Sequence, residues 1–464
     1  MLALDRRTAI ALLAAGVFFM ENLDATIITT ALPAMAKEFG VLPAQLSVGV
    51  SAYLVALTMF IPASGWAADR YGARRVFPVA IIVFTLASLL CAASGSLLGF
   101  TLARILQGLG GAMMVPVGRL AVLRNTPKEG IVRALAILTW PGLVAPILGP
   151  PVGGWISMYW SWHWIFLINL PLGLVALFAA WVLIRDDEER SNRFDLPGFV
   201  LSGLGFAFFM SGIELASRAD LPSAPAVVTL AAGLVLLGVS AWHLRRVDHP
   251  LFGLAPLAIQ TFRVTAVGGS LFRTAIGSAP FLLPLMFQLG FGYSAVESGI
   301  LLLWLFAGNL CIKPATTAIM HRFGFRTVLV VNGLLVAAGF AGFALLQADT
   351  PRAVTIALLF FSGVTRSMQF TALNTIGFSD VPPPQMRDAT TLFSVLQQMN
   401  AGMGIAVGAL ALSAAERLRD TAAGMVGTGD FQLAFWLLAA LALAAVVDCL
   451  MLPRDAGQRV LAPR

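Results

Sequence analysis

Two carboxylates lie inside an apolar run near the start of the chain. Glu21 and Asp24 interrupt a run that begins near Thr8 and carries no other charge. Burying an ionised carboxylate in such a run is costly, so acidic residues there mark functional sites by default. A spacing of three residues places both on one face of a helix, and one of two neighbouring carboxylates in a dry site tends to hold a proton. The pair therefore predicts the proton-handling end of a membrane transporter.

A basic residue, Arg104, is the predicted partner of this pair. Counted at about 1.5 Å per residue from the predicted span ends, Arg104 and Asp24 both fall in the outer half of a bilayer. A lone arginine at mid-membrane costs roughly 2.5–3.5 kcal/mol on insertion scales, so it needs a partner. Arg104 is predicted to modulate the proton affinity of the Glu21 and Asp24 pair. A permanent structural salt bridge is the alternative.

Three cations form a second candidate site later in the chain. Arg273, Lys313 and Arg366 each lie within a predicted span, away from its ends. Asn309 is one helical turn from Lys313, and Gln369 shares a helix side with Arg366. Cations that face one centre would bind a carboxylate or a phosphate through charge-assisted hydrogen bonds. The alternatives are snorkelling to the interface, chiefly for Lys313, and pairing with helix-end dipoles.

The cationic site predicts the charge of the transported molecule. A pocket for lipophilic cations would be expected to carry carboxylates, so we expect an anionic or zwitterionic organic solute, such as a carboxylate or a metal–carboxylate chelate. Other polar residues of the spans are candidates for the cavity lining, although each alone is equally consistent with packing: Tyr53, Gln107, Gln288, Asn374, Gln397 and Asn400. The three cysteines all fall within spans, where packing is favoured over disulfide or metal chemistry, so no metal site is predicted.

The composition places these residues in lipid. Of 464 residues, 58% are hydrophobic and 11% are charged, whereas a soluble domain has about 25% charged residues. The apolar runs are about 20 residues long, which is the length a helix needs to cross hydrocarbon. The net charge of +7 comes from basic residues scattered over short loops. The lipid bilayer is therefore the expected partner, and nucleic acid is not.

About fourteen spans are predicted, which makes the fold class an all-α polytopic membrane protein. They lie near residues 8–32, 45–67, 77–97, 99–122, 133–157, 163–184, 196–216, 224–244, 264–288, 295–319, 327–347, 353–376, 389–414 and 430–452. Basic residues favour one set of connecting loops roughly fourfold, and the positive-inside rule makes that side cytoplasmic. An even number of spans then places both termini in the cytoplasm.

The N-terminus also has some features of a cleaved signal peptide. Asp5-Arg6-Arg7 resembles a charged leader segment, and Ala34-Met35-Ala36 resembles a cleavage site. The apolar run between them is too long and contains the two carboxylates. We therefore expect the first apolar run to be a membrane span.

Two short loops repeat one pattern and suggest an internal duplication. Residues 69–74 read Asp-Arg-Tyr-Gly-Ala-Arg after the second span, and residues 321–326 read His-Arg-Phe-Gly-Phe-Arg after the tenth. Parallel repetition of two six-helix halves is a common plan of secondary transporters, although an echo of six residues can also arise by chance. The predicted organisation is a six-helix bundle in residues 1–190, a two-helix insert in 191–250 and a second six-helix bundle in 251–464.

Several motifs follow one another in a fixed order along the first half. They are Leu23–Ile28 with Ala31-Leu32-Pro33, Gly65–Arg75, Arg104–Ala112, Gly142 with Gly149–Gly154, and Trp162–Pro171. In this order and at these spans, they resemble the major facilitator superfamily, and within it the fourteen-span drug:proton antiporters. His163 departs from the pattern, because that family usually has Arg at this position.

The resemblance implies a major facilitator fold with fourteen transmembrane helices that works by alternating access in a bacterial-type inner membrane. It implies that Asp24 has the chief proton role, and that the protein is a monomer without a cofactor. The loop after the second span would latch the two halves on the cytoplasmic side, through Gly65, Asp69, Arg70, Gly72 and Arg74. The fifth span would seal the outward route, through Gly142, Gly149, Pro150, Gly153 and Gly154. A plain anchoring loop and a merely kinked packing helix are the respective alternatives.

The predicted function is multidrug-type efflux by a solute:H⁺ antiporter. No Gly-x-x-x-x-Gly-Lys-Ser/Thr sequence is present, so we expect the proton gradient to drive transport. Each inward proton charge gains about 2.3 kcal/mol per 100 mV of membrane potential. An exporter of lipophilic cationic drugs and dyes and a proton-coupled importer of small metabolites are the alternatives. An enzyme is not expected, because the spans lack His-Glu-x-x-His and Gly-x-Ser-x-Gly motifs and clustered histidines.

Overall fold

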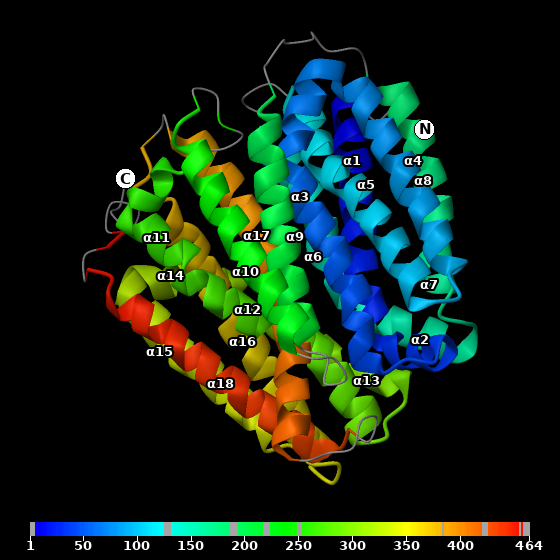
Figure 1. Cartoon of the computed structure of the whole chain (residues 1–464), viewed down its shortest axis with the longest axis vertical. Coiled ribbons are helices and arrows are strands. Elements are labelled where there is room, and N and C mark those ends of the chain that lie inside the picture. Colours follow the sequence, from blue (N-terminus) through cyan, green and yellow to red (C-terminus); the bar gives the residue numbers. More distant parts are fainter. Residues whose placement is uncertain are drawn as a thin grey trace.

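The computed structural model consists of long helices that pack in two groups (Figure 1). It describes residues 5–124, 131–184, 194–216, 223–247, 250, 253–382, 385–419, 426–453 and 456–457. All regular elements in these ranges are helical, with no strand. The predicted all-α polytopic fold is confirmed.

The first group of helices carries the two carboxylates. Its long members are α1 (Arg6–Ile27), α3 (Ser47–Tyr71), α4 (Ala73–Ala92), α5 (Leu97–Arg124), α6 (Ile131–Tyr159) and α8 (Asn169–Leu183). Helix α1 packs against α5, α6 and α8, and α5 also packs against α3 and α4. Short helices connect the long ones: η1 (Ile28–Thr30), α2 (Leu32–Phe39), η2 (Pro43–Leu46) and α7 (Trp164–Leu167).

The second group carries the three predicted cations. It begins with the short helices η4 (Ala255–Ala258) and α11 (Gln260–Ala266). The others are α12 (Gly268–Leu285), η5 (Met286–Gly290), α13 (Ala295–Cys311), α14 (Lys313–Phe323), α15 (Phe325–Ala344), α16 (Arg352–Gly377), α17 (Met386–Leu418) and α18 (Thr428–Leu450). Helix α12 packs against α17 and α18, α13 against α16, and α15 against α16 and α18.

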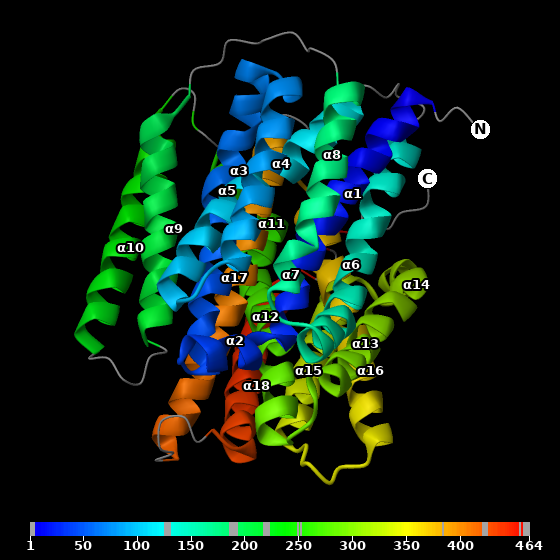
Figure 2. The ribbon, with the colours of Figure 1, turned by 90° about the vertical axis from the view of Figure 1, so that its right-hand side faces the viewer.

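Two further helices stand beside these groups. Helices α9 (Leu196–Ala216) and α10 (Ser223–Leu244) pack against each other, and α9 also contacts α3 and α17. In Figure 2, α10 is the outermost helix at the left, and α9 lies between it and the rest of the molecule. The division of the chain into a bundle, an insert and a second bundle stays a prediction.

Apolar surface and helix length identify the membrane spans. Twelve helices in the described residues are long and apolar enough to cross a membrane, and the count is thirteen if the bent pair α13 and α14, which meet at 49°, forms one span. Outward-facing side chains of α8 are apolar, and Val175 and Phe178 are 70% and 71% exposed. Such a surface fits lipid better than water. The count of fourteen stays a prediction, since several side chains of α6 lie outside the described residues.

The repeated loops share one backbone conformation. Gly72 joins α3 to α4 with φ 78° and ψ 145°, and Gly324 joins α14 to α15 with φ 73° and ψ 158°. Only glycine adopts this conformation without strain. The sequence echo therefore corresponds to a structural one at equivalent helix junctions.

Candidate functional site

Asp24 lies at the centre of a buried polar network between α1, α5 and α8. Its Oδ2 accepts a hydrogen bond from Arg104 Nη1 at 2.6 Å. Its Oδ1 accepts from Gln107 Nε2 at 2.9 Å and from Asn169 Nδ2 at 2.7 Å. None of these four side chains is more than 1% exposed. Asp24 thus accepts three hydrogen bonds, one of them from a cation, as a buried carboxylate requires if it is to stay ionised.

A second layer of contacts fixes the donors around Asp24. Gln107 Oε1 accepts from Arg104 Nη1 at 2.5 Å. Ser88 Oγ accepts from Gln107 Nε2 at 2.9 Å and from Asn169 Nδ2 at 3.2 Å. The Arg104 guanidinium lies 4.1 Å from the centre of the Tyr53 ring, a cation–π contact. Tyr53 and Gln107, both predicted to line a cavity, are instead packed against the arginine.

Sequence reasoning missed two members of this network, Ser88 and Asn169. Asn169 is the first residue of α8, directly after the break that separates it from α7. An amide at a helix break within an apolar span is a signal that could have drawn attention to it. Ser88 gives no such signal, because a single small hydroxyl in a span is usually satisfied by its own helix. Here it does donate to Phe84 O at 2.9 Å.

Glu21 lies one turn before Asp24 and has a different environment. Its side chain is buried, at 7% exposure, and its Oε2 has no hydrogen-bond partner among the described residues. The Tyr53 hydroxyl is likewise buried and without a partner there. Both groups flank Gly111, where a Cβ atom would lie 3.7 Å from Glu21 Cδ and 3.3 Å from Tyr53 Oη. A second, unsatisfied carboxyl therefore adjoins the Asp24 network.

The structure separates the three predicted cations into two places. Arg273 donates to Thr265 O at 2.9 Å and to Asn374 Oδ1 at 3.0 Å. Lys313 is exposed and donates to Thr371 Oγ1 at 3.1 Å. Because Thr371 and Asn374 are one turn apart on α16, Arg273 and Lys313 contact neighbouring positions of the same helix.

Arg366 lies in a different pocket, between α12, α13, α15 and α16. Its Nε and Nη1 atoms are buried and have no hydrogen-bond partner among the described residues. The pocket is narrow, with a cavity volume of about 10 Å³, and is lined by Ile276, Ala279, Leu305, Val336, Phe340, Ser362, Thr365 and Arg366. None of the three cations forms an ion pair in the described part of the chain.

The remaining predicted lining residues are spread over several environments. Gln369 is buried, and its Oε1 accepts from Asn332 Nδ2 at 2.8 Å. Gln288 Nε2 donates to Thr30 O at 3.3 Å, across the two helix groups. Asn400 donates to Ser270 Oγ at 2.8 Å. Asn309 is half-buried, whereas Asn374 and Gln397 are exposed.

The predicted gating residues of α6 make close backbone contacts. Cβ atoms at Gly149 and Gly153 would lie 2.3 Å from Thr26 Oγ1 and 2.2 Å from Ile27 O, both in α1. A Cβ atom at Gly154 would lie 2.4 Å from Ala295 O at the start of α13. Helix α6 therefore has glycine where it meets α1 in its own group and α13 in the other.

Helix α13 also has a glycine at its contact with α6. A Cβ atom at Gly299 would lie 2.4 Å from Pro150 O, the carbonyl of another predicted gating residue. Together with the bond between Gln288 and Thr30, these contacts join the two groups at the end that the orientation prediction makes the outer one. We call the contact of Gly154 and Pro150 with Ala295 and Gly299 the outer seal.

The predicted latch after the second span is described only in part. Arg70 and Arg74 are exposed on either side of Gly72, the junction residue with positive φ. The side-chain surroundings of Asp69, and the positions of Gly65 and Gly142 relative to their neighbours, lie outside what the structure describes.

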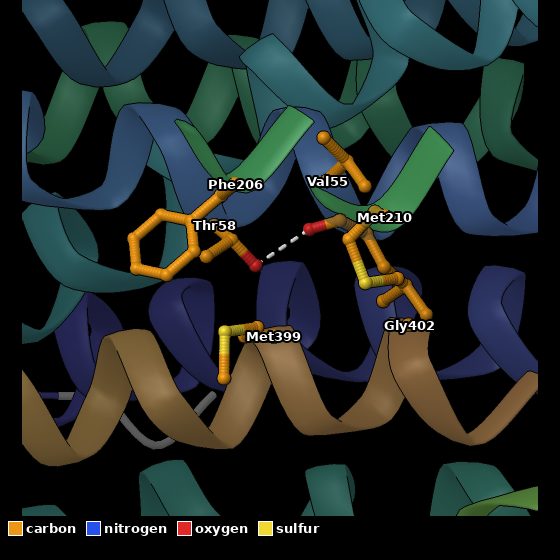
Figure 3. A pocket seen from close by; sticks show the side chains of 7 residues that line it. Val55, Thr58, Phe206, Met210, Met399 and Gly402 are labelled. Atoms are coloured by element: carbon orange, nitrogen blue, oxygen red, sulfur yellow. Dashed lines mark hydrogen bonds between the residues drawn. The ribbon is translucent and has the colours of Figure 1, made fainter. Parts of the chain in front are cut away.

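A second small pocket lies where α9 meets α3 and α17 (Figure 3). It has almost no volume open to a water-sized molecule and is lined by Leu54, Val55, Thr58, Phe206, Met210, Met399 and Gly402. Its one side-chain hydroxyl, on Thr58, donates to Leu54 O at 2.7 Å within α3. This apolar pocket offers no charged group to a solute.

Comparison with known proteins identifies the family. The family model of the Major Facilitator Superfamily matches residues 14–409. The putative multidrug resistance protein MdtD of Pectobacterium atrosepticum is 38% identical over 396 residues, which cover 85% of this chain and 85% of that protein. The protein of the same name from Escherichia coli is 36% identical over 454 residues, covering 96% of this chain and 95% of that protein.

Solved structures agree with this assignment at the level of the fold. The D-xylose-proton symporter superposes with a TM-score of 0.67 at 14% identity, covering 97% of this chain and 98% of that one. The human organic anion transporter MFSD10 superposes with a TM-score of 0.61 at 15% identity, covering 96% and 99%. With a matching family model, relatives well above 30% identity and the helical architecture described above, this chain belongs to the Major Facilitator Superfamily of membrane transporters.

Proposed function

We propose that this transporter exports a small organic solute in exchange for protons, in a bacterial inner membrane with both termini in the cytoplasm. The observation that carries the proposal is the pair of buried carboxylates, Glu21 and Asp24, beside Arg104 in an apolar bundle. Such intramembrane acids are typical of proton relays. The name of the MdtD relatives supports efflux of the multidrug type.

The geometry supports a two-state exchange. A bound proton changes the net charge of the carboxylate site, and a ligand shifts a conformational equilibrium only as far as it binds the two states differently. The outer seal is closed in this structure, with α6 and α13 in backbone contact. Opening this seal would expose the carboxylate site to the outer solution, from which the proton enters. The inward proton then supplies about 2.3 kcal/mol per 100 mV.

The proposed solute is an organic anion or a zwitterion. Arg273, Lys313 and Arg366 form no ion pair in the described residues, so the second helix group carries uncompensated positive charge. A carboxylate supplied by the solute would provide the missing counter-charge. If the protein exported lipophilic cations, these three basic side chains would have no role in binding the solute.

Substitution of the cations tests this choice. Replacing Arg366 or Arg273 with alanine is expected to weaken the apparent affinity for organic anions by about tenfold or more, because a hydrogen bond to a charged group contributes roughly 1.5–3 kcal/mol. The measurement is proton movement in liposomes with an imposed pH gradient, with cationic dyes, neutral drugs and organic anions offered in turn.

Arg352 provides the matched control, since it is an exposed arginine already paired with Glu297 at 2.6 Å. Its replacement by alanine should leave the response to anions unchanged. A response limited to cationic dyes, and insensitive to Arg273→Ala and Arg366→Ala, would refute the anion site. No proton movement with any compound would refute the exchange itself.

A further inference from the structure

We propose that Glu21, rather than Asp24, takes up and releases the transported proton, and that Asp24 stays ionised as the fixed partner of Arg104. This inference rests on the proposed proton exchange and names the residue that performs it. The contrast between the two carboxyl groups of α1 carries the argument: one has a complete set of donors, and the other has an orphaned oxygen.

The surroundings of Asp24 oppose protonation. All three of its hydrogen-bond partners are N–H donors, and both of its oxygens are engaged. A proton on Oδ1, which already accepts two hydrogen bonds, would displace one donor, and a proton on Oδ2 would weaken the bond that this oxygen accepts from Arg104. It would also leave Arg104 buried without its counter-ion, and breaking a buried pair in this way costs several kcal/mol. Such a site is poorly suited to a proton that must bind and leave in every transport cycle.

The surroundings of Glu21 suit a group that alternates between neutral and charged. In the neutral form, the buried carboxyl avoids the cost of an unpaired buried charge. The ionisable side chains around it are Asp24 on α1 and Tyr53 on α3, and Arg104 on α5 contacts both of these. Helix α8 has no charged residue, and the one charged residue of α6, Arg133, lies outside the described side chains. A proton on Glu21 therefore disrupts no hydrogen bond of the Asp24 network.

The hydroxyl of Tyr53 is suited to hydrogen bonding with either the ionised or the protonated form of Glu21. A phenolic hydroxyl donates to an ionised carboxylate and accepts from a protonated carboxyl. The Tyr53 hydroxyl has no partner among the described residues and flanks Gly111 together with Glu21. Its ring lies against the Arg104 guanidinium at 4.1 Å. Tyr53 therefore lies beside the same glycine as the proposed proton site and also contacts the arginine of the ion pair, which gives a physical route by which proton binding at Glu21 reaches Arg104.

The glycine at position 111 keeps this space open. A methyl group there would lie 3.3 Å from Tyr53 Oη and 3.4 Å from Leu57 Cδ1, which is tight packing around the hydroxyl. With glycine, residue 111 places no side chain in the space beside the hydroxyl and the carboxyl. The site is thus formed by three helices, α1, α3 and α5, that the sequence pattern alone does not bring together.

Infrared difference spectroscopy on the purified full-length protein tests the assignment without a solute. On acidification, the C=O stretching band of one buried carboxylic acid is expected to appear in the wild type. It should be lost in Glu21→Gln and retained in Asp24→Asn. A band that persists in Glu21→Gln and disappears in Asp24→Asn would overturn the assignment.

Transport in liposomes gives a second readout, with the compound of the panel that moves protons in the wild type. Glu21→Gln is expected to keep solute counterflow at equal pH and to lose export driven by a pH gradient. Asp24→Asn is expected to lose both, since Arg104 would be left unpaired. Gradient-driven export that survives in Glu21→Gln would also overturn the assignment.

Glu38→Gln is the matched control, because it makes the same chemical change in a half-exposed side chain. The amide can still accept the bond that Trp162 Nε1 donates to Glu38 at 2.6 Å. Both readouts should match the wild type. If no compound moves protons in wild-type vesicles, the proposed exchange fails, and the infrared band still decides which carboxyl binds a proton.

Discussion

Replacing Arg104 with alanine is expected to lower the free energy of unfolding by about 3–5 kcal/mol, because the loss of one partner leaves the other charge of a buried pair uncompensated. Asp24 would keep its bonds from Gln107 and Asn169 but lose its counter-ion at 2.6 Å. Gln107 Oε1 would lose its arginine donor as well and keep only the weak bond from Cys91 Sγ at 3.8 Å. The measurement is detergent-induced unfolding of the purified protein, followed by its helical circular dichroism.

Two comparisons separate this effect from a general loss of charge. Adding Asp24→Asn to Arg104→Ala removes the stranded carboxylate, so the double variant should recover part of the lost stability. Arg352→Ala breaks an exposed pair, whose side chains are 69% and 41% exposed, and should cost less than about 1 kcal/mol. If Arg104→Ala unfolds like Arg352→Ala, the buried pair contributes little to stability.

Replacing Gly154 or Gly299 with valine is expected to abolish transport by preventing closure of the outer seal. The added Cβ would lie 2.4 Å from the backbone oxygen of Ala295 in Gly154→Val, and 2.4 Å from that of Pro150 in Gly299→Val. A carbonyl of the facing helix cannot rotate away as a long side chain would, so α6 and α13 must separate. Packed helices do not absorb such a displacement locally, and the conformation with the outer end open should accumulate.

Distances between spin labels measure this shift. Labels at Met158 on α6 and Leu345 after α15 are suitable, because both side chains are well exposed, at 54% and 67%. The distance between them should lengthen in Gly154→Val and in Gly299→Val. Gly16→Val and Gly238→Val are the controls, since a Cβ at either glycine meets no atom within 4 Å. Wild-type distances combined with full transport in Gly154→Val would contradict the proposed seal.

The sequence predicted the fold class because the relevant signal is local. An apolar run of about 20 residues must cross the bilayer as a helix, whatever its neighbours are. The same local logic applied to Arg104: an arginine in such a run needs an acid, and the structure pairs it with Asp24. The repeated loop pattern likewise anticipated equivalent glycine junctions at Gly72 and Gly324.

Sequence spacing did not predict which side chains meet across helices. It placed Glu21 and Asp24 on one helix face, but gave no sign that Gln107 and Asn169 would bond to Asp24 while Glu21 Oε2 has no partner among the described residues. Those bonds depend on how α5 and α8 are rotated and how deeply they lie against α1. No periodicity along a single helix contains that information.

The cationic residues show the same limit in the second half of the chain. Their positions within spans suggested one anion site, yet Arg273 and Lys313 contact α16 near Thr371 and Asn374, and Arg366 lines another pocket. The sequence by itself determined that these charges lie in membrane helices and must be compensated, because the cost of a charge in hydrocarbon does not depend on the fold. Only the tertiary structure decided which charges are compensated by the protein, because hydrogen-bonded contact depends on helix rotation and packing. Among the described residues, Glu21 Oε2 and two nitrogens of Arg366 are buried without a hydrogen-bond partner, and these are the groups that the proposed proton and solute would meet.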